Sequence, residues 1–439
     1  VCPYQLSLDL MPWMDVVVAD IHYVYSLTAA VGALMAGQRQ RWTILVDEAH
    51  NLPDRARGMF SAVIAKSALM SARRVSEATV RRSLDKVNRQ LLALQKEKWL
   101  EQDFDSREQQ PNQLLEALQS LVAIVSERLS SQPAYLQRRP ELLAFYFDVL
   151  QFIRVAEHWG EDFRLELSRD SGRQSLRVKL ACLDPARLLA QGHARAHAVA
   201  AFSATLSPLA WSRSCLGLGE DAVCHQAVSP FSPDQLVVSI AVDIDTRYRQ
   251  RELSLPGLAR TLVAWLADVP GNCIVYFPAY RYLRDCAEQL AHAGLDQLQR
   301  QLWIQQPGLG ESERNALLQQ LAERRDVVAF CILGGVFGEG IDLPGEQLAS
   351  IVVVGVGMPQ LNRQTRQLQD WYQQRYGSGF EYAFVYPGMQ KVDQALGRVV
   401  RRLDDRGRAL LIDPRYGEQR YRQLLPPWWD YHPWPGEPG

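Results

Sequence analysis

The sequence predicts an α/β protein with parallel sheets, interrupted by one long helical segment. Short apolar runs such as Thr43 to Val46 and Cys273 to Phe277 are typical of strands buried on both faces. Between about residues 54 and 170 such runs vanish, and apolar residues recur at helical spacing instead. From about residue 229 strand and helix patterns alternate again, which favours parallel pairing. We therefore expect two α/β units and a helical insertion.

The composition is that of an ordinary globular protein, with 47% hydrophobic and 22% charged residues. A length of 439 residues exceeds one ordinary hydrophobic core. The net charge of −1 gives the whole chain no electrostatic signature of nucleic-acid binding. No apolar run approaches the roughly 18 residues needed to cross a bilayer, so we expect no contact with membranes. Seven cysteines without C-x-x-C spacing argue against a disulfide scaffold and favour a reducing compartment, the cytoplasm.

The expected strands fall into two groups along the chain. Helices are expected between several strands of the second group, over 255–267 and 282–293. The first group covers 14–19, 43–46, 175–183 and 197–202, and the second covers 236–242, 273–277, 327–333, 351–356, 382–386 and 409–412.

Two carboxylates, Asp47 and Glu48, directly follow the strand predicted at 43–46. Ligands of open α/β sheets bind beyond the carboxyl ends of the strands. Asp47 is expected to hold Mg²⁺, an ion that takes oxygen ligands and few carboxylates. Glu48 is expected to orient and deprotonate the water that attacks the γ-phosphate of ATP, while His50 reports the nucleotide state to a neighbouring motif. A charged turn after a strand is common, so this motif alone does not decide the function.

A hydroxyl-bearing tripeptide, Ser203-Ala204-Thr205, follows the strand predicted at 197–202. Its hydroxyls could contact the region of Asp47 and Glu48 and link the nucleotide state to domain closure. The competing interpretation is an ordinary helix N-cap, which is favoured for this tripeptide taken alone.

A glycine-rich stretch follows the strand predicted at 327–333 and contains Gly338, Glu339, Gly340 and Asp342. Glycines at such a position let the backbone approach a ribose, a phosphate or a nucleic-acid strand. We expect this stretch to bind the nucleotide cofactor.

Three polar residues, Gln394, Arg398 and Arg401, recur at offsets of four and three. In a helix this spacing places them on one face. Two fixed guanidiniums suit the charge that develops on a γ-phosphoryl group during its transfer. A solvated basic face is the competing interpretation.

Four segments in this order resemble the motor motifs of superfamily 2 helicases, and most closely the XPD/DinG-type family, in particular bacterial DinG-like members. They are Asp-Glu-Ala-His at 47–50, Ser-Ala-Thr-Leu-Ser-Pro at 203–208, Gly-Glu-Gly-Ile-Asp at 338–342 and Gln-x-x-Gly-Arg-x-x-Arg at 394–401.

Three further segments strengthen this resemblance, which covers essentially the whole chain. Val-Gly-Met-Pro at 356–359 is similar to a stretch of the bacterial members. The helical insertion resembles the arch domain of the family. Cys2-Pro3-Tyr4 is similar to the segment that carries the fourth cysteine ligand of the family's 4Fe–4S cluster.

The resemblance implies two RecA-like motor domains, the first incomplete at its N-terminus. Residues 1–55 and 175–228 would form part of the first, and 56–174 an arch-like helical insertion. Residues 229–425 would form the second motor domain, and 426–439 an irregular tail.

The resemblance also implies an ATP-driven motor that moves 5′ to 3′ on single-stranded DNA and unwinds duplexes at DNA junctions, with a role in DNA repair. Its cofactors would be ATP, Mg²⁺ and a 4Fe–4S cluster. Arg401, with Arg398, would reach the γ-phosphate. Glu339 and Asp342 would couple the nucleotide to DNA, as would Ser203 and Thr205.

Two elements of the family pattern are missing from these 439 residues. There is no G-x-x-x-x-G-K-[ST] loop, and Cys2 is the one plausible cluster ligand. We therefore expect a fragment of a helicase that alone hydrolyses little or no ATP. Two alternatives stay open: a catalytically inactive nucleic-acid-binding or regulatory protein, and an RNA helicase of the same superfamily.

Overall fold

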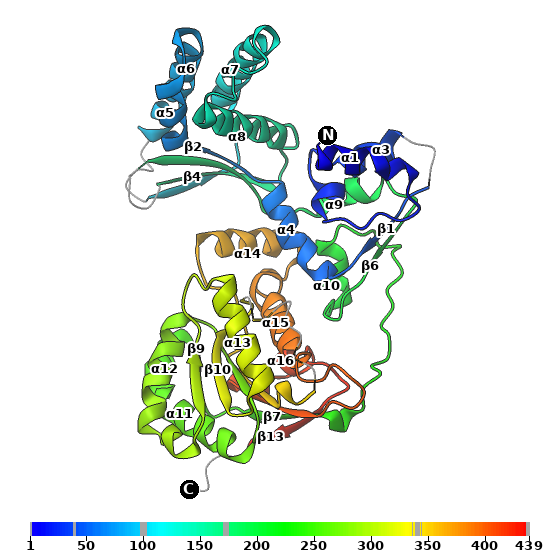
Figure 1. Cartoon of the computed structure of the whole chain (residues 1–439), viewed down its shortest axis with the longest axis vertical. Helices are drawn as coiled ribbons and strands as arrows, with labels where there is room; N and C mark the ends of the chain where they lie inside the picture. The colour runs from blue at the N-terminus through cyan, green and yellow to red at the C-terminus, as the bar shows by residue number, and fades with distance from the viewer. Residues whose placement is uncertain are drawn as a thin grey trace. The chain divides into compact units, whose positions relative to one another are not determined.

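A computed structural model describes residues 2–37, 41–96, 103–169, 175–335, 337–338, 343 and 345–435 (Figure 1). The chain separates into two compact units. Unit 1 comprises Val1–Ser203 and Ser212–Ala222, and unit 2 comprises Ala204–Trp211 and Val223–Gly439. Both contain parallel strands, which confirms the predicted α/β class. Among the described residues, no helix is both long and apolar enough to span a bilayer.

The parallel sheet of unit 1 has two strands within the described residues. Strand β1 (Thr43–Val46) pairs in parallel with β6 (Ala198–Ala201). The prediction of a strand at 14–19 was wrong. These residues adopt no regular structure, and Val18 is 96% exposed. No described strand offers them a partner, and β-branched residues alone do not make a strand. Short helices accompany the pair: α1 (Pro3–Leu10), α2 (His22–Tyr25), α3 (Ala30–Gly37), α4 (Leu52–Met59) and α9 (Ala186–His193).

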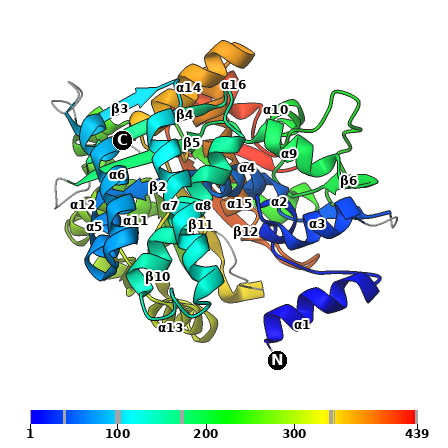
Figure 2. The same cartoon turned by 90° about the horizontal axis from the view of Figure 1, so that it is seen from above.

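The insertion contains the predicted amphipathic helices, α5 (Lys66–Val75), α6 (Ala78–Gln95), α7 (Asn112–Ser131) and α8 (Pro140–Glu157). They lie over one side of a sheet that the sequence analysis missed (Figure 2). This antiparallel sheet has the order β2-β5-β4-β3. Its strands are β2 (Ala62–Ala65), β3 (Phe104–Arg107), β4 (Phe163–Arg169) and β5 (Leu176–Cys182).

The antiparallel sheet corrects two expectations about the insertion. The segment 56–174 is not purely helical, because it contains β2, β3 and β4, and strands of four to seven residues with half-buried positions leave a weak pattern in the sequence. Strand β5, assigned from sequence to the first motor domain, pairs instead with β4 and β2. The predicted boundary at 175 therefore falls inside the sheet of the insertion, while the other boundaries remain predictions.

Unit 2 is built on a seven-stranded sheet with the order β13-β7-β12-β11-β8-β10-β9, in which every pair is parallel. Five of the six strands predicted here are confirmed to within two residues at each end. The strands are β7 (Leu236–Ala241), β8 (Cys273–Phe277), β9 (Gln301–Ile304), β10 (Val327–Ile332), β11 (Ser350–Val354), β12 (Gly407–Ile412) and β13 (Asp430–Pro433).

Helices cover both faces of this sheet. In β8, Ile274 and Tyr276 face the core shared with α13 (Glu311–Glu323) and α15 (Tyr386–Leu396). Val275 and Phe277 face the core shared with α11 (Arg251–Asp268) and α12 (Tyr280–His292). This period of two explains why every residue of β8 is buried and why its sequence is uniformly apolar.

Two further predictions for unit 2 were wrong. The strand predicted at 382–386 is a π-helix, Glu381–Val385, that continues into α15, because a short apolar run does not distinguish a strand from a buried helix. The tail predicted to be irregular contains β13, which pairs with β7 and places Asp430 opposite Val237. It is an edge strand, where Pro433 is tolerated.

Candidate active-site constellation

The two strands of unit 1 bring its predicted motifs to one edge. The backbone N–H of Phe202 donates to the carbonyl of Val46 at 3.0 Å, and that of Ala49 donates to the carbonyl of Phe202 at 3.1 Å. These bonds extend the ladder beyond β1 and β6. As a result, Glu48 and Ser203 lie side by side at the carboxyl ends of parallel strands.

A hydrogen-bonded triad of side chains occupies this edge. The Ser203 hydroxyl donates to Glu48 Oε2 at 3.2 Å, and His50 Nδ1 lies 2.7 Å from Ser203 Oγ. Because the hydroxyl proton is directed at the carboxylate, His50 Nδ1 is the donor to Ser203. The expected contact of Ser203 with the acidic pair is thus confirmed. The His50 side chain is 7% exposed, whereas Glu48 is 64% exposed and so open to a water molecule or a ligand.

The backbone of Glu48 is left-handed, with φ 46° and ψ 44°. Few residues other than glycine adopt this conformation, and it persists where the surroundings hold it in place. Here the N–H of Glu48 donates to Asp47 Oδ1 at 2.8 Å, and its carbonyl accepts from Asn51. The strained turn sets the direction in which the two neighbouring carboxylates leave the strand.

Thr205 lies in unit 2, although Ser203 lies in unit 1. Its carbonyl accepts a hydrogen bond of 2.6 Å from Gln390 Nε2 on α15, and both residues are buried. Sequence reasoning missed Gln390. The one available signal was its place a single helical turn before Gln394.

The glycine-rich loop of unit 2 is held from several sides. The buried Tyr276 hydroxyl donates to the carbonyl of Phe337 at 3.0 Å, and burial raises the pKa of Tyr276 so that it remains a donor. Arg398 donates to the carbonyl of Gly338 at 3.0 Å. Gly334 has φ 73°, a left-handed conformation that glycine adopts without the strain that a Cβ would bring. The predicted residues Glu339, Gly340 and Asp342 lie outside the described residues.

The predicted helical face of Gln394, Arg398 and Arg401 was wrong. Helix α15 ends at Leu396, so Arg398 lies in the following turn and Arg401 lies beyond it. Asp405 causes the change of direction, because its Oδ2 accepts from the backbone N–H groups of Arg401 at 2.9 Å and Arg402 at 2.8 Å. Sequence reasoning missed this role of Asp405.

The described residues differ in how well they fit the two implied metal groups. A single carboxylate such as Asp47 is sufficient for Mg²⁺, which keeps several of its waters. A 4Fe–4S cluster needs four ligands, and Cys2 is exposed at the start of α1. Within the described residues, no group of three or more His, Cys, Asp or Glu could hold a metal ion. These residues therefore fit Mg²⁺ but do not by themselves fit the cluster.

Family comparisons match both ends of the chain. The Helicase C-terminal domain family matches residues 262–432, and the DEAD_2 family matches residues 1–69. The chain is 20% identical over 508 residues to the ATP-dependent DNA helicase CHL1 of Scheffersomyces stipitis, covering 98% of this chain and 58% of that protein. Both matched families and this relative make the chain similar to XPD/CHL1-like superfamily 2 DNA helicases.

A second curated relative carries a related name. The chain is 25% identical to the putative ATP-dependent DNA helicase DDX11-like protein 8 of Homo sapiens, over 74% of this chain and 40% of that protein. It thus spans 40–58% of the length of these two curated relatives.

Solved structures extend the likeness to the fold. A structure titled XPD_Helicase has a TM-score of 0.63 and 18% identity, covering 99% of this chain and 75% of that one. The structure of S. tokodaii Xpd4 has a TM-score of 0.60 and 14% identity, covering 94% of this chain and 81% of that one.

Proposed function

We propose that this chain supplies the water-activating and arginine-bearing parts of an ATP-driven DNA helicase that moves 5′ to 3′ on single-stranded DNA. The observation that carries the proposal is the triad of Glu48, Ser203 and His50 at the carboxyl ends of two parallel strands. The names of the relatives, ATP-dependent DNA helicases, support the choice of substrate.

In this proposal Glu48 orients and deprotonates the water that attacks the γ-phosphate. Ser203 and His50 hold the Glu48 carboxylate in one direction, because the hydroxyl donates to it and the imidazole fixes the hydroxyl. Asp47 would hold Mg²⁺, which neutralises charge on the β- and γ-phosphates when it is bound. Arg401 would stabilise the charge that develops on the transferred group, and Arg398 would keep the glycine-rich loop in place.

The sequence contains no phosphate-binding G-x-x-x-x-G-K-[ST] loop. We propose that a loop from outside these 439 residues completes the ATP site, and that the 439 residues alone hydrolyse little or no ATP. A 4Fe–4S cluster would likewise need three ligands besides Cys2, so no step is assigned to it. Five of the seven free cysteines are buried thiols, which suits the reducing cytoplasm as the site of action.

The test is ATP hydrolysis by the product of the complete reading frame, with and without single-stranded DNA or RNA of equal length. Glu48→Gln keeps the size of the side chain and removes the base. We expect it to lower the DNA-stimulated kcat by about 10²–10⁴-fold while ATP still binds. Stimulation by RNA rather than DNA would replace the proposal with an RNA helicase. A complete reading frame that binds DNA without any ATP hydrolysis would replace it with a regulatory DNA-binding protein.

A further inference from the structure

Helix α6 of the insertion carries a stripe of cations on one face. Arg82, Lys86 and Arg89 follow one another at spacings of four and three, so their side chains lie along the same side of the helix. All three are exposed, and within the described residues none of them forms an ion pair. The acid on the same helix, Asp85, is engaged by Arg73 at 2.5 Å. Among the described residues, no acid therefore neutralises this stripe, in a chain whose net charge is −1.

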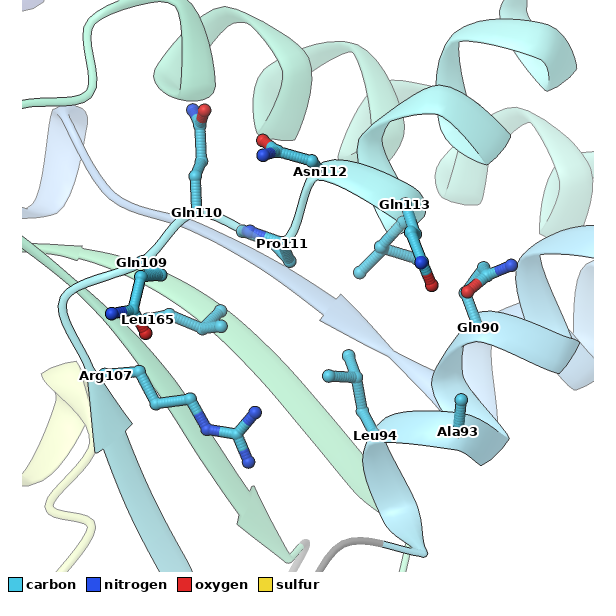
Figure 3. Close-up of a pocket in the computed structure, with 11 residues that line it drawn as sticks. Gln90, Ala93, Leu94, Arg107, Gln109, Gln110, Pro111, Asn112, Gln113 and Leu165 are labelled. Atoms are coloured by element: carbon cyan, nitrogen blue, oxygen red, sulfur yellow. The ribbon is translucent and has the colours of Figure 1, made fainter.

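A cleft lies beside the last turns of α6 (Figure 3). Ala93, one turn beyond Arg89 on the same face, lines this cleft together with Gln90 and Leu94. The opposite wall comes from the segment after β3 and from the first turn of α7. The cleft has a volume of about 210 Å³ and is open to solvent.

The lining of the cleft combines amides with apolar side chains. The apolar surface of the cleft comes from the partly exposed Leu94 and Pro111, above Leu114 and Leu165, which are each 2% exposed. Gln90 and Gln113 reach the cleft from α6 and α7, and the side chain of Gln110 is fixed by a hydrogen bond to the carbonyl of Ala156 at 2.6 Å. Further polar lining comes from Gln109 and Asn112.

This lining favours a neutral, planar ligand over a phosphate. Among the described residues no acid lines the cleft, and the one cation that lines it, Arg107, pairs with Asp105 at 2.6 Å. Side-chain amides donate and accept at once, as the edge of a nucleobase requires, and Asn and Gln are common partners of adenine. Apolar surface beneath a base replaces the stacking that the base loses on leaving a strand.

We propose that single-stranded DNA runs along α6, with phosphates at Arg82, Lys86 and Arg89 and one unstacked base in the cleft beyond Ala93. This inference rests on the proposed function and deepens it, because it places a DNA-binding site on the insertion. The cations provide affinity without sequence preference, and the amides select bases that expose a donor beside an acceptor.

The stripe is tested by comparing two double variants of the full chain that lose the same charge. Arg82→Gln/Arg89→Gln removes two stripe cations, whereas Arg138→Gln/Arg154→Gln removes two exposed arginines on other parts of the insertion. Binding of a fluorescent 20-mer is measured at several salt concentrations. We expect the first variant to bind at least tenfold more weakly and to lower the slope of log K against log salt by about 1.4, at about 0.7 per phosphate. An equal loss of DNA affinity in the two variants would contradict the role of the stripe in DNA binding.

The cleft is tested with Gln90→Leu/Gln113→Leu, which keeps side-chain volume and helix propensity but removes the hydrogen bonds. We expect about tenfold weaker binding to an adenine-containing strand and no change with an abasic strand of the same length. Equal losses on both strands would overturn the base site, and thermal unfolding of each variant shows whether it is folded.

Failure of this inference is distinguishable from failure of the proposed function. Absence of DNA binding and DNA-stimulated hydrolysis in the wild type would remove both. If the wild type binds DNA and neither the stripe variant nor the cleft variant changes that binding, the inference of a DNA site on α6 fails while the proposed function stands. If the cleft binds peptides in preference to DNA, and an abasic strand binds as well as an adenine-containing one, the cleft is a protein-binding site instead.

Discussion

The two parallel sheets of this chain support their candidate site residues in very different ways. In unit 2 the sheet has seven strands, and every residue of the inner strand β11 is buried. In unit 1 the described parallel sheet has two strands, and β1 alternates buried and exposed residues, with Leu45 68% exposed. A two-stranded sheet gains little stability by itself. The acidic pair of unit 1 therefore depends on its local hydrogen bonds, whereas the glycine-rich loop of unit 2 rests on a large core.

The largest expected effect comes from truncating matched aliphatic residues in the two sheets. Ile351→Ala in β11 removes a fully buried side chain and should lower the free energy of unfolding of unit 2 by about 2–5 kcal/mol. Leu45→Ala in β1 should change the stability of unit 1 by no more than about 0.5 kcal/mol. Urea unfolding followed by hydrogen exchange of peptides from each unit measures both. Equal effects would mean that the exposed face of β1 is covered in solution.

An intermediate effect is expected at Asp393, beside Gln394 on α15. Burial raises the pKa of Asp393 well above its ordinary value of 3.8, and its Oδ1 has no hydrogen-bond partner among the described residues. Folding therefore takes up a proton, so this group lowers stability as the pH rises above about 3.8 toward the folded-state pKa. Asp393→Asn should raise the stability of unit 2 by about 1–3 kcal/mol at neutral pH and flatten that pH dependence.

The control for this prediction is Asp404→Asn, an exposed acid beyond the end of the same helix. We expect that substitution to leave the urea midpoint unchanged between pH 5 and pH 8. A fall in stability on Asp393→Asn at neutral pH would show that the carboxylate has a charged partner and is ionised in the folded chain.

The smallest effect tests the strained turn of unit 1. Because Glu48 has φ 46°, Glu48→Gly relieves the left-handed strain and should raise the stability of unit 1 by up to about 1 kcal/mol, whereas Glu48→Ala should not. Both variants should lose DNA-stimulated hydrolysis. Hydrogen exchange of the peptide around 43–52 compares them, and a destabilising effect of Glu48→Gly would mean that the turn owes its conformation to the carboxylate.

Sequence patterns predicted the sheet of unit 2 well because its strands are buried on both faces. A strand such as Cys273–Phe277 must be apolar throughout, which leaves a strong signal. The edge strands β9 and β13 and the strands β2 and β3 of the insertion are four residues long and partly exposed, so their signal is weak. The π-helix at Glu381–Val385 was misread because its apolar run is as short as a strand.

The candidate site likewise has residues whose placement the sequence predicted and residues whose placement it did not. Residues fixed by the ends of strands, Glu48 and Ser203, lie where the sequence predicted. Arg398 and Arg401 do not share a helical face, because a distant acid, Asp405, redirects the chain after Leu396. Contacts of this kind, like that of Gln390 with Thr205, depend on tertiary packing, which spacing along the chain does not encode.

The central claim is that Glu48 is the base of an ATP-hydrolysing DNA motor. Its most direct test is single-turnover ATP hydrolysis by the complete reading frame on single-stranded DNA, comparing wild type with Glu48→Gln and Ser203→Ala. Our account predicts a loss of about 10²–10⁴-fold for Glu48→Gln with ATP binding retained, and a smaller loss for Ser203→Ala, which only orients the carboxylate. A Glu48→Gln protein that hydrolyses ATP at the wild-type rate would contradict it.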